Sequence, residues 1–153
     1  SVDTMSRLFE LKNIVGVKDA TGDLNRVDQS IKAMGKEFIQ LTGEDYNALE
    51  FNQRGGVGCI SVTANVAPKP CSEMQQASIS SNDQSLLDKA KKIHQKLSPL
   101  HKALFIESNP APVKYAAKIL GLCDDEIRLP LVNIKEETKH EIDKALSIAK
   151  LVK

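Results

Sequence analysis

One lysine, Lys18, ends a short apolar run at a place where an amine could act as a nucleophile. The run covers residues 14–18 and has the length and β-branched content of a buried strand. Side chains alternate across a strand, so Ile14, Gly16 and Lys18 share one face. An amine with apolar walls around it has a lowered pKa, and in its neutral form it can attack a ketone to form an imine. Spacing alone, however, favours a lysine that simply marks the end of a strand in solvent.

Two turn segments beside strand-like runs could help to bind a ligand. Residues 19–23 follow Lys18 and offer backbone N–H groups near a helix start, where a carboxylate could bind, although an ordinary strand-to-helix loop has the same pattern. Gly43 lies in the equivalent place after the next run and would let a ligand approach the backbone closely. Glu44 and Asp45 could suggest acid–base work, but they fit better as favourable charges at the positive end of the following helix.

Two further patterns do not support a site. The glycines of residues 55–58 precede a strand-like run, whereas a phosphate-binding loop follows a strand and opens a helix. His94 and His101 lie two turns apart on one expected helix, roughly 10 Å along its axis. A single metal ion binds nitrogen ligands at about 2 Å, so this pair is expected to hold no metal. We predict no metal site, and we expect both histidines to make polar surface or partner contacts.

Composition limits the function classes. The 153 residues carry 21 basic and 20 acidic side chains, a net charge of +1, and no run of like charge. Electrostatic binding to nucleic acid or to a membrane is therefore not expected. Cys59, Cys71 and Cys123 lack the close spacing of a disulfide framework or a zinc site, which predicts reduced thiols in a cytoplasmic protein. No apolar run is long enough to span a membrane.

The apolar periodicity changes along the chain and predicts two domains. Strands are expected near residues 14–18, 38–43 and 58–63, and helical patterns lie at 24–34, from Asp45 to about residue 54, and at 68–78. Alternating strands and helices indicate a parallel α/β arrangement. From about residue 83 only helices are expected, through residues 86–104 with a bend at Pro99, then 112–120, then 142–149. We place the domains at 1–80 and 81–153.

Three βα units would leave two open sheet edges beside strongly apolar strands. We therefore expect the last three units of a (β/α)8 TIM barrel followed by an all-helical domain, with Lys18 at the carboxyl end of a strand, where such barrels build their sites. The chain begins at Ser1, without an initiator Met, and is expected to open inside a helix.

The segments around these elements resemble a known family. They occur in order along nearly the whole chain: IVGVKDATG (14–22), LTGED (41–45), GCISVTANV (58–66), PLH (99–101), NPAPVK (109–114) and RLPL (128–131). Together they are similar to the C-terminal half of the dihydrodipicolinate synthase family, within the wider superfamily of pyruvate-dependent Schiff-base aldolases. The lysine strand alone would indicate only the superfamily.

The resemblance implies a lyase that condenses pyruvate with aspartate 4-semialdehyde to 4-hydroxy-tetrahydrodipicolinate, in lysine and diaminopimelate biosynthesis. It implies that Lys18 forms the imine with pyruvate, that Ile60 contacts the bound pyruvate, and that the backbone of Gly43 lines the pocket. It implies no cofactor, and a cytoplasmic homotetramer as the intact enzyme.

The same resemblance implies that much of the site lies upstream of Ser1: a proton-relay tyrosine, paired threonines, an arginine and a tyrosine from a neighbouring subunit. Tyr46 and Tyr115 do not match these tyrosines. We therefore expect a chain that needs the missing N-terminal half of the barrel and is inactive alone. Two alternatives remain: an N-acetylneuraminate lyase-like or keto-sugar-acid aldolase, and a non-catalytic truncated assembly module.

Overall fold

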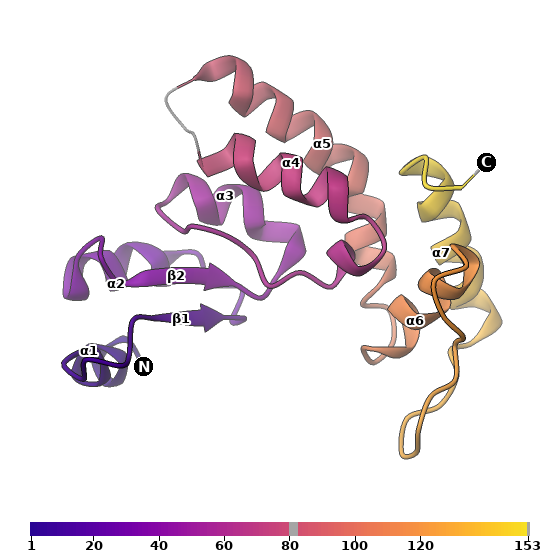
Figure 1. Cartoon of the computed structure of the whole chain (residues 1–153), viewed down its shortest axis with the longest axis horizontal. Helices are drawn as coiled ribbons and strands as arrows, with labels where there is room; N and C mark the ends of the chain where they lie inside the picture. The colour runs from indigo at the N-terminus through magenta and orange to yellow at the C-terminus, as the bar shows by residue number, and fades with distance from the viewer. Residues whose placement is uncertain (80–82, 153) are drawn as a thin grey trace. The chain divides into compact units, whose positions relative to one another are not determined.

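The computed structural model describes residues 1–79 and 83–152. The chain forms two compact units, which we call the sheet unit (Ser1–Ser61 with Met74–Ala90) and the helical unit (Val62–Glu73 with Lys91–Lys153). The elements follow one another along the chain in Figure 1: α1 (Val2–Phe9), β1 (Gly16–Asp19), α2 (Asn25–Met34), β2 (Ile39–Thr42), the short helix η1 (Asp45–Asn47), α3 (Ala48–Gln53), the short helix η2 (Thr63–Asn65), α4 (Pro68–Ile79), α5 (Gln84–Ala103), α6 (Ala111–Ile119) and α7 (Glu136–Ile148).

β1 and β2 are the strands of the sheet unit, and they run side by side in the same direction (Figure 1). Their register pairs Gly16 with Ile39 and Lys18 with Leu41, so the predicted parallel arrangement of these two strands is confirmed. The pairing needs a glycine at position 16, because a Cβ atom there would lie 2.3 Å from the carbonyl oxygen of Ile39. Gly16 therefore sets how closely the two strands approach.

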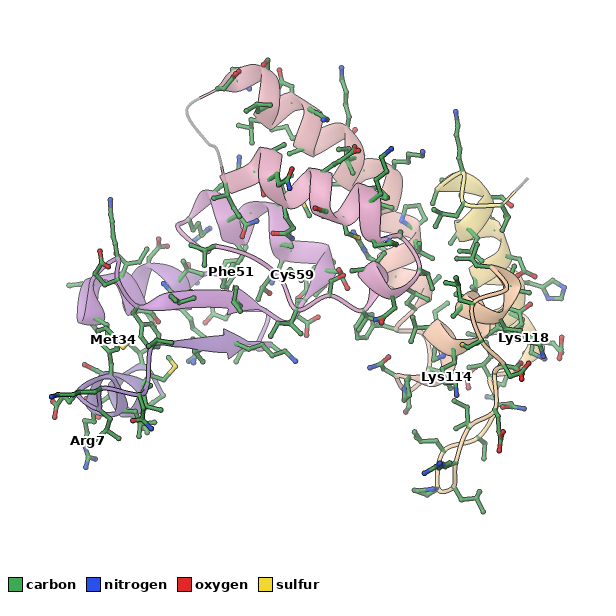
Figure 2. All side chains as sticks on the ribbon, viewed as in Figure 1. Arg7, Met34, Phe51, Cys59, Lys114 and Lys118 are labelled. Atoms are coloured by element: carbon green, nitrogen blue, oxygen red, sulfur yellow. The ribbon has the colours of Figure 1, made fainter. Side chains whose placement is uncertain are left out.

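The predicted third strand, at residues 58–63, is wrong in extent. The structure has a single parallel bridge between Thr42 and Cys59 in its place. The backbone N–H of Ile60 still donates to the carbonyl of Thr42 at 2.8 Å, and that of Val57 donates to Gln40 at 2.9 Å. Figure 2 labels Cys59 in this extended segment. The segment pairs with β2 over too few residues to form a ladder and then turns into η2 at Thr63.

The helices of the sheet unit cover one face of β2. Burial alternates along the strand, with Gln40 and Thr42 buried while Ile39 is exposed. On the covered side lie the buried side chains Val27 of α2 and Phe51 of α3, the latter labelled in Figure 2. The sequence led us to expect strands covered on both faces. Among the described residues, one face has no cover.

The helices near the sheet begin and end where the sequence predicts. The carboxylate of Asp23 accepts the backbone N–H of Asn25 at 3.0 Å, which satisfies a donor at the start of α2. Gly35 follows the last residue of α2 with φ of 80°, a left-handed conformation that glycine adopts without strain. α1 begins directly after Ser1, whose hydroxyl accepts the backbone N–H of Thr4 at 3.1 Å.

The helical unit contains one continuous core. Its fully buried side chains come mainly from α5, α6 and α7 and include Leu97, Leu100, Leu104, Ala116, Ile142 and Leu146. These residues follow the predicted periodicity. The helical patterns at 86–104 and 112–120 are confirmed within two residues by α5 and α6, whereas α7 covers the pattern at 142–149 to Ile148 but begins six residues earlier than predicted, at Glu136. The predicted domain boundary between residues 80 and 81 falls outside the described residues and stays a prediction.

No helix in residues 1–79 and 83–152 has both the length and the apolar character needed to cross a lipid bilayer.

Candidate active site

Lys18 lies near the carboxyl end of β1, on the face of the sheet that the helices leave open. It is the third of four residues in the strand, and its side chain is exposed. Its strand neighbour across the sheet is Leu41. Among the described residues no hydrogen bond or ion pair occupies the Lys18 amine. The amine is therefore accessible to a reactant on this face.

Gly43 lies directly against Lys18. A Cβ atom at position 43 would lie 2.5 Å from Cε of Lys18, 3.3 Å from its Nζ and 2.8 Å from Cβ of Ala20. A side chain at this position would displace the end of the lysine or the loop that follows it. Gly43 thus leaves the space that the amine occupies, and its backbone is among the closest groups to that amine.

Ile60 shares an apolar depression with Lys18. The depression has a volume of about 320 Å³ and is open to solvent. Its lining comes from β1, β2 and the extended segment after them: Asn13, Ile14, Val15, Gly16, Val17, Lys18, Ile39, Leu41 and Ile60. The structure therefore brings Lys18, Gly43 and Ile60 together at one end of the sheet, although the sequence separates them by 25 and 42 residues.

The expected environment of the strand differs in one respect. A buried strand was expected over residues 14–18, whereas Val15 is 60% exposed and lines the depression. Val15 precedes β1, and its carbonyl accepts the backbone N–H of Ile39 at 2.9 Å. Val17 lies within the strand and is partly buried.

The loop of residues 19–23 is held by its own side chains. The Asp19 carboxylate accepts the backbone N–H of Thr21 at 2.8 Å, its hydroxyl at 2.6 Å and Nε of Arg26 at 2.6 Å. The Thr21 hydroxyl in turn accepts the backbone N–H of Asp23 at 3.3 Å. These N–H groups already have acceptors. The loop is thus better described as an ordinary strand-to-helix connection than as a carboxylate-binding turn.

The charge of Asp19 is stabilised where it lies. Burial raises the pKa of its carboxyl group, but hydrogen bonds from Thr21 and Arg26 outweigh that effect, and the pKa is lowered below its ordinary value. The carboxylate is therefore ionised at neutral pH. Since its partners approach from the loop and from α2, its charge is compensated on the covered side of the sheet.

The loop after β2 is organised around Asp45, which is buried at the start of η1. One carboxylate oxygen accepts a short hydrogen bond from the hydroxyl of Ser61, and Sγ of Cys59 lies 4.0 Å from the same oxygen. The sequence suggested that Glu44 and Asp45 favour a helix start, which describes the position of Asp45 but misses this contact. A polar pair 16 residues apart leaves no periodic pattern that could have predicted it.

Tyr46 lies over the loop that follows β1. A Cβ atom at Gly22 would lie 2.5 Å from the Tyr46 hydroxyl oxygen, and Gly22 has φ of 76°. Both the contact and the backbone conformation require glycine there. The loops after the two strands therefore pack together, Ala20 near Gly43 and Gly22 under Tyr46.

The glycines of residues 55–58 pack against hydrophobic side chains. A Cβ atom at Gly56 would lie 2.1 Å from the Phe51 ring, and one at Gly55 would lie 2.7 Å from Ile31. Close packing against α2 and α3 accounts for both glycines without a bound phosphate.

The expectation for the two histidines was wrong in its geometry. The ring centroids of His94 and His101 are 5.7 Å apart, not roughly 10 Å, because the two side chains lean toward each other on one face of α5. His101 is also buried, and its Nδ1 lies 2.8 Å from the hydroxyl oxygen of Thr63, so it makes no surface contact. Within residues 1–79 and 83–152, no three His, Cys, Asp or Glu side chains are grouped to hold a metal ion.

Known proteins match nearly the whole chain. A sequence model of the family described as "Dihydrodipicolinate synthetase family" matches residues 1–149. A 4-hydroxy-tetrahydrodipicolinate synthase of Pelagibacter ubique (strain HTCC1062) is 64% identical over 152 residues, which are 99% of this chain and 52% of that protein. The protein of the same name from Parvibaculum lavamentivorans is 54% identical over 152 residues, covering 99% of this chain and 51% of that protein. The chain thus spans about half the length of these curated relatives.

Solved structures agree with the fold. The dihydrodipicolinate synthase of Acinetobacter baumannii, described as chloride-inhibited and complexed with pyruvate, matches with a TM-score of 0.92 at 42% identity. The match covers 99% of this chain and 51% of that one. The enzyme from Aquifex aeolicus matches with a TM-score of 0.91 at 38% identity, over 99% of this chain and 50% of that one.

Proposed function

The chain belongs to the dihydrodipicolinate synthetase family, and from that premise we propose that it supplies the Schiff-base lysine of a lyase. The proposed reaction condenses pyruvate with aspartate 4-semialdehyde to give 4-hydroxy-tetrahydrodipicolinate, in the biosynthesis of diaminopimelate and lysine. The observation that carries the proposal is the position of Lys18. Its amine lies near the carboxyl end of a parallel strand, against Gly43 and beside an apolar depression.

The chemistry needs a neutral amine and an apolar wall. The Lys18 nitrogen attacks the keto carbon of pyruvate, and loss of water leaves an imine. The imine withdraws electrons, so a proton leaves the methyl group and an enamine forms. The enamine carbon attacks the aldehyde carbon of the second substrate. The amine of that substrate then displaces Lys18, which closes the ring and frees the lysine. No metal or organic cofactor enters these steps.

Gly43 and Ile60 take supporting parts in this proposal. The bare backbone of Gly43 allows the keto acid to approach the amine closely, since even a methyl group would meet the lysine side chain. Ile60 presents an apolar surface to the methyl end of pyruvate, from the same depression as Lys18. An apolar wall also excludes water from the imine and slows its hydrolysis.

We propose that this chain is the last three βα units of a TIM barrel followed by a helical domain, with the domains at 1–80 and 81–153. The exposed apolar side chains on the open face of the sheet, Ile39 and Ile60, support an incomplete barrel, because barrel strands are covered on both faces. The first part of the barrel would cover Ile39 and Ile60 and supply the proton-transfer groups. The chain alone would therefore be inactive, and the intact cytoplasmic enzyme would be a homo-oligomer.

Trapping of the imine tests this function. We define the completed chain as this chain joined behind the N-terminal half of the Pelagibacter ubique relative. Pyruvate and borohydride should give one adduct on Lys18 of the completed chain, seen by peptide mass spectrometry, together with turnover of aspartate 4-semialdehyde. The unjoined chain should show neither in stoichiometric amount. Lys18→Met is the matched control, because it keeps the aliphatic side chain without the amine.

Four outcomes would contradict the proposal. An adduct on another lysine of the completed chain would remove Lys18 from its role. Turnover of N-acetylneuraminate or a keto-sugar acid in place of the semialdehyde would indicate another aldolase of the superfamily. A stoichiometric adduct on the unjoined chain with normal turnover would show that the chain is complete as a catalyst. Sedimentation of the unjoined chain as a compact oligomer, together with a completed chain that forms no adduct and has no turnover, would favour an assembly module.

A further inference from the structure

The residue that follows the reactive lysine is an acid, and its carboxylate is turned away from the amine. Successive side chains of a strand point to opposite faces, so Lys18 faces the open side and Asp19 the covered side. The Asp19 side chain is 11% exposed, and its three donors come from Thr21 and Arg26. A carboxylate released from these donors would be the nearest negative charge along the chain to the Lys18 ammonium group.

Arg26 compensates this charge in a defined geometry. Its Nε lies 2.6 Å from Oδ2 of Asp19, and its side chain is 23% exposed, so the ion pair is partly withdrawn from solvent. Arg26 stands in the first turn of α2, seven residues after Asp19. Because Arg26 belongs to α2, the ion pair attaches the loop to this helix as well as balancing the charge of Asp19.

The other acids on the neighbouring loops are already engaged or lie elsewhere. The carboxylate of Asp23 accepts the backbone N–H of Asn25, and Asp45 is buried with an oxygen bonded to Ser61. Glu44 is partly buried in the loop after β2, and the Tyr46 hydroxyl lies over Gly22. In the described part of the chain, none of these groups forms an ion pair with Lys18.

We propose that Arg26 is a positioning residue for the imine-forming amine. It holds the Asp19 carboxylate on the covered side of the sheet and cancels its charge. Asp19 therefore does not act as a counter-ion for the Lys18 ammonium group. The purpose of this arrangement rests on the proposed function. The electrostatic effect itself can be measured without catalysis.

A charge-balance cycle on the chain measures the effect directly. Acetic anhydride acetylates only neutral amines, and mass spectrometry compares Lys18 with Lys96, a lysine of the helical unit, in the same sample. Arg26→Gln should lower the relative rate at Lys18 about two- to fourfold at pH 7, the effect expected of one uncompensated charge on the neighbouring residue in a partly hydrated site. Asp19→Asn combined with Arg26→Gln should restore it to within about 1.5-fold of the original rate.

Two single variants and one control keep the test decisive. Asp19→Asn alone leaves Arg26 uncompensated and should raise the relative rate about twofold. Arg26→Lys keeps the charge and should stay close to the original rate. Arg54→Gln is the matched control, because Arg54 carries the same charge in the same unit but pairs with Asp28 and Glu50. It should leave the labelling of Lys18 unchanged.

A purely structural role for Arg26 predicts a different pattern. The double variant would then be as slow as Arg26→Gln or slower, since removing a second partner cannot rebuild the loop. That result, or an equal labelling rate of Lys18 in all variants, would overturn the proposal. Circular dichroism checks that each variant is folded. If Arg26→Gln unfolds the chain, the contrast between Asp19→Asn and Arg26→Lys still gives the sign of the charge effect.

The same variants in the completed chain separate this inference from the proposed function. Borohydride trapping of pyruvate should follow the order of the labelling rates. If the completed chain forms no adduct on Lys18 at all, the proposed function fails while the labelling cycle still reports on the ion pair. If the adduct forms equally fast in every variant, the function stands and the positioning role fails.

Discussion

Ile142 and Ile60 are the same side chain in two regions of the molecule, and their environments are opposite. Ile142 lies in the core of the helical unit with none of its surface exposed, whereas Ile60 is 51% exposed on the open face of the sheet unit. Ile39, which lines the same depression, is 44% exposed. The helical unit has a core to which α5, α6 and α7 all contribute, although Ile119 and Ile148 of these helices are 44% and 45% exposed, whereas the sheet of the sheet unit is covered on one face only.

This difference identifies the sheet unit as the part of the chain with an uncovered apolar face. Burial of an isoleucine side chain contributes about 1.5–3 kcal/mol, so the row on the sheet face represents stability that the sheet unit does not gain by itself. Exposed apolar rows of this kind mark binding surfaces. The same face carries the Lys18 amine, so under the proposed function one covering segment would both stabilise the strands and close the site.

The largest expected contrast comes from one substitution made in both places. Ile142→Ala should lower the free energy of unfolding of the helical unit by about 3 kcal/mol, because it leaves a cavity in a close-packed core. Ile60→Ala should cost less than about 0.5 kcal/mol in the sheet unit, because half of the side chain is already in water. Urea unfolding followed by tyrosine fluorescence measures both.

The chain provides a separate probe for each unit. It has two tyrosines and no tryptophan, with Tyr46 in the sheet unit and Tyr115 in the helical unit. Tyr46→Phe leaves Tyr115 as the reporter, and Tyr115→Phe leaves Tyr46. Equal costs for Ile142→Ala and Ile60→Ala would show that the sheet face is covered in solution, for example by a second copy of the chain.

A smaller effect should show that the sheet unit is well packed on its other side. Asn52 of α3 is buried, and its Nδ2 donates to Oε1 of Gln75 at 2.6 Å and to the hydroxyl of Ser78 at 2.8 Å. Asn52→Ala removes these bonds and leaves buried polar groups without a donor, so it should cost about 1–2 kcal/mol. Tyr46 fluorescence in urea reports the change.

Gln29→Ala is the control for that prediction, because Gln29 is an exposed residue of α2 and its replacement by a good helix former should be close to neutral. An Asn52→Ala variant as stable as the control would indicate that the covered side of the sheet is loose as well. The asymmetry between the two faces would then have no energetic basis.

Elements with a periodic pattern could be predicted from the sequence. The helical stripe through Leu97, Leu100 and Leu104 and the strand that ends near Lys18 both lie where their spacing places them. The prediction of a third strand was wrong because apolar β-branched residues do not by themselves ensure a neighbouring strand to pair with. Residues 57–60 bond to β2 on one side, and the chain turns into η2 before a ladder can form.

Contacts between polar side chains far apart in the sequence could not be predicted. The contact of Asp45 with Ser61 and that of Asn52 with Ser78 join residues 16 and 26 positions apart, and neither pair leaves a periodic trace. For His94 and His101 the prediction used the separation along the helix axis in place of the distance between the rings. Helical rise gives the separation along the axis, but long side chains can tilt toward each other by several ångströms. Gly43 could be linked to Lys18 from its equivalent place after the next strand, whereas Ile60 was linked to it only by the family resemblance. The structure places both near Lys18.

The smallest expected effect is a dependence of the helical unit on pH that the sheet unit does not share. Burial lowers the pKa of His94, because its imidazolium form would lose solvation. Its ring lies beside that of His101, which in turn contacts the Thr63 hydroxyl. The unfolded chain then binds the proton more tightly than the folded one. Stability should be constant above the ordinary pKa of histidine, near 6.5, and should fall as the pH drops toward the lower value of the folded state.

Carboxyl groups ordinarily change charge at lower pH than histidine, so they do not account for this decrease in stability. Glu107, Asp125 and Glu136 of the helical unit have pKa values lowered by hydrogen bonds, so their contribution is lost only below the ordinary range of carboxyl groups. Histidine is the side-chain type whose ordinary pKa lies between about pH 5.5 and 7. Urea midpoints followed by Tyr115 should decrease over this interval, and His94→Phe should remove much of the decrease while keeping a ring against His101. His140→Gln, which changes an exposed histidine of α7, should leave the decrease unchanged. A decrease that survives His94→Phe but disappears in His140→Gln would show that a surface charge, and not the buried ring, controls the response.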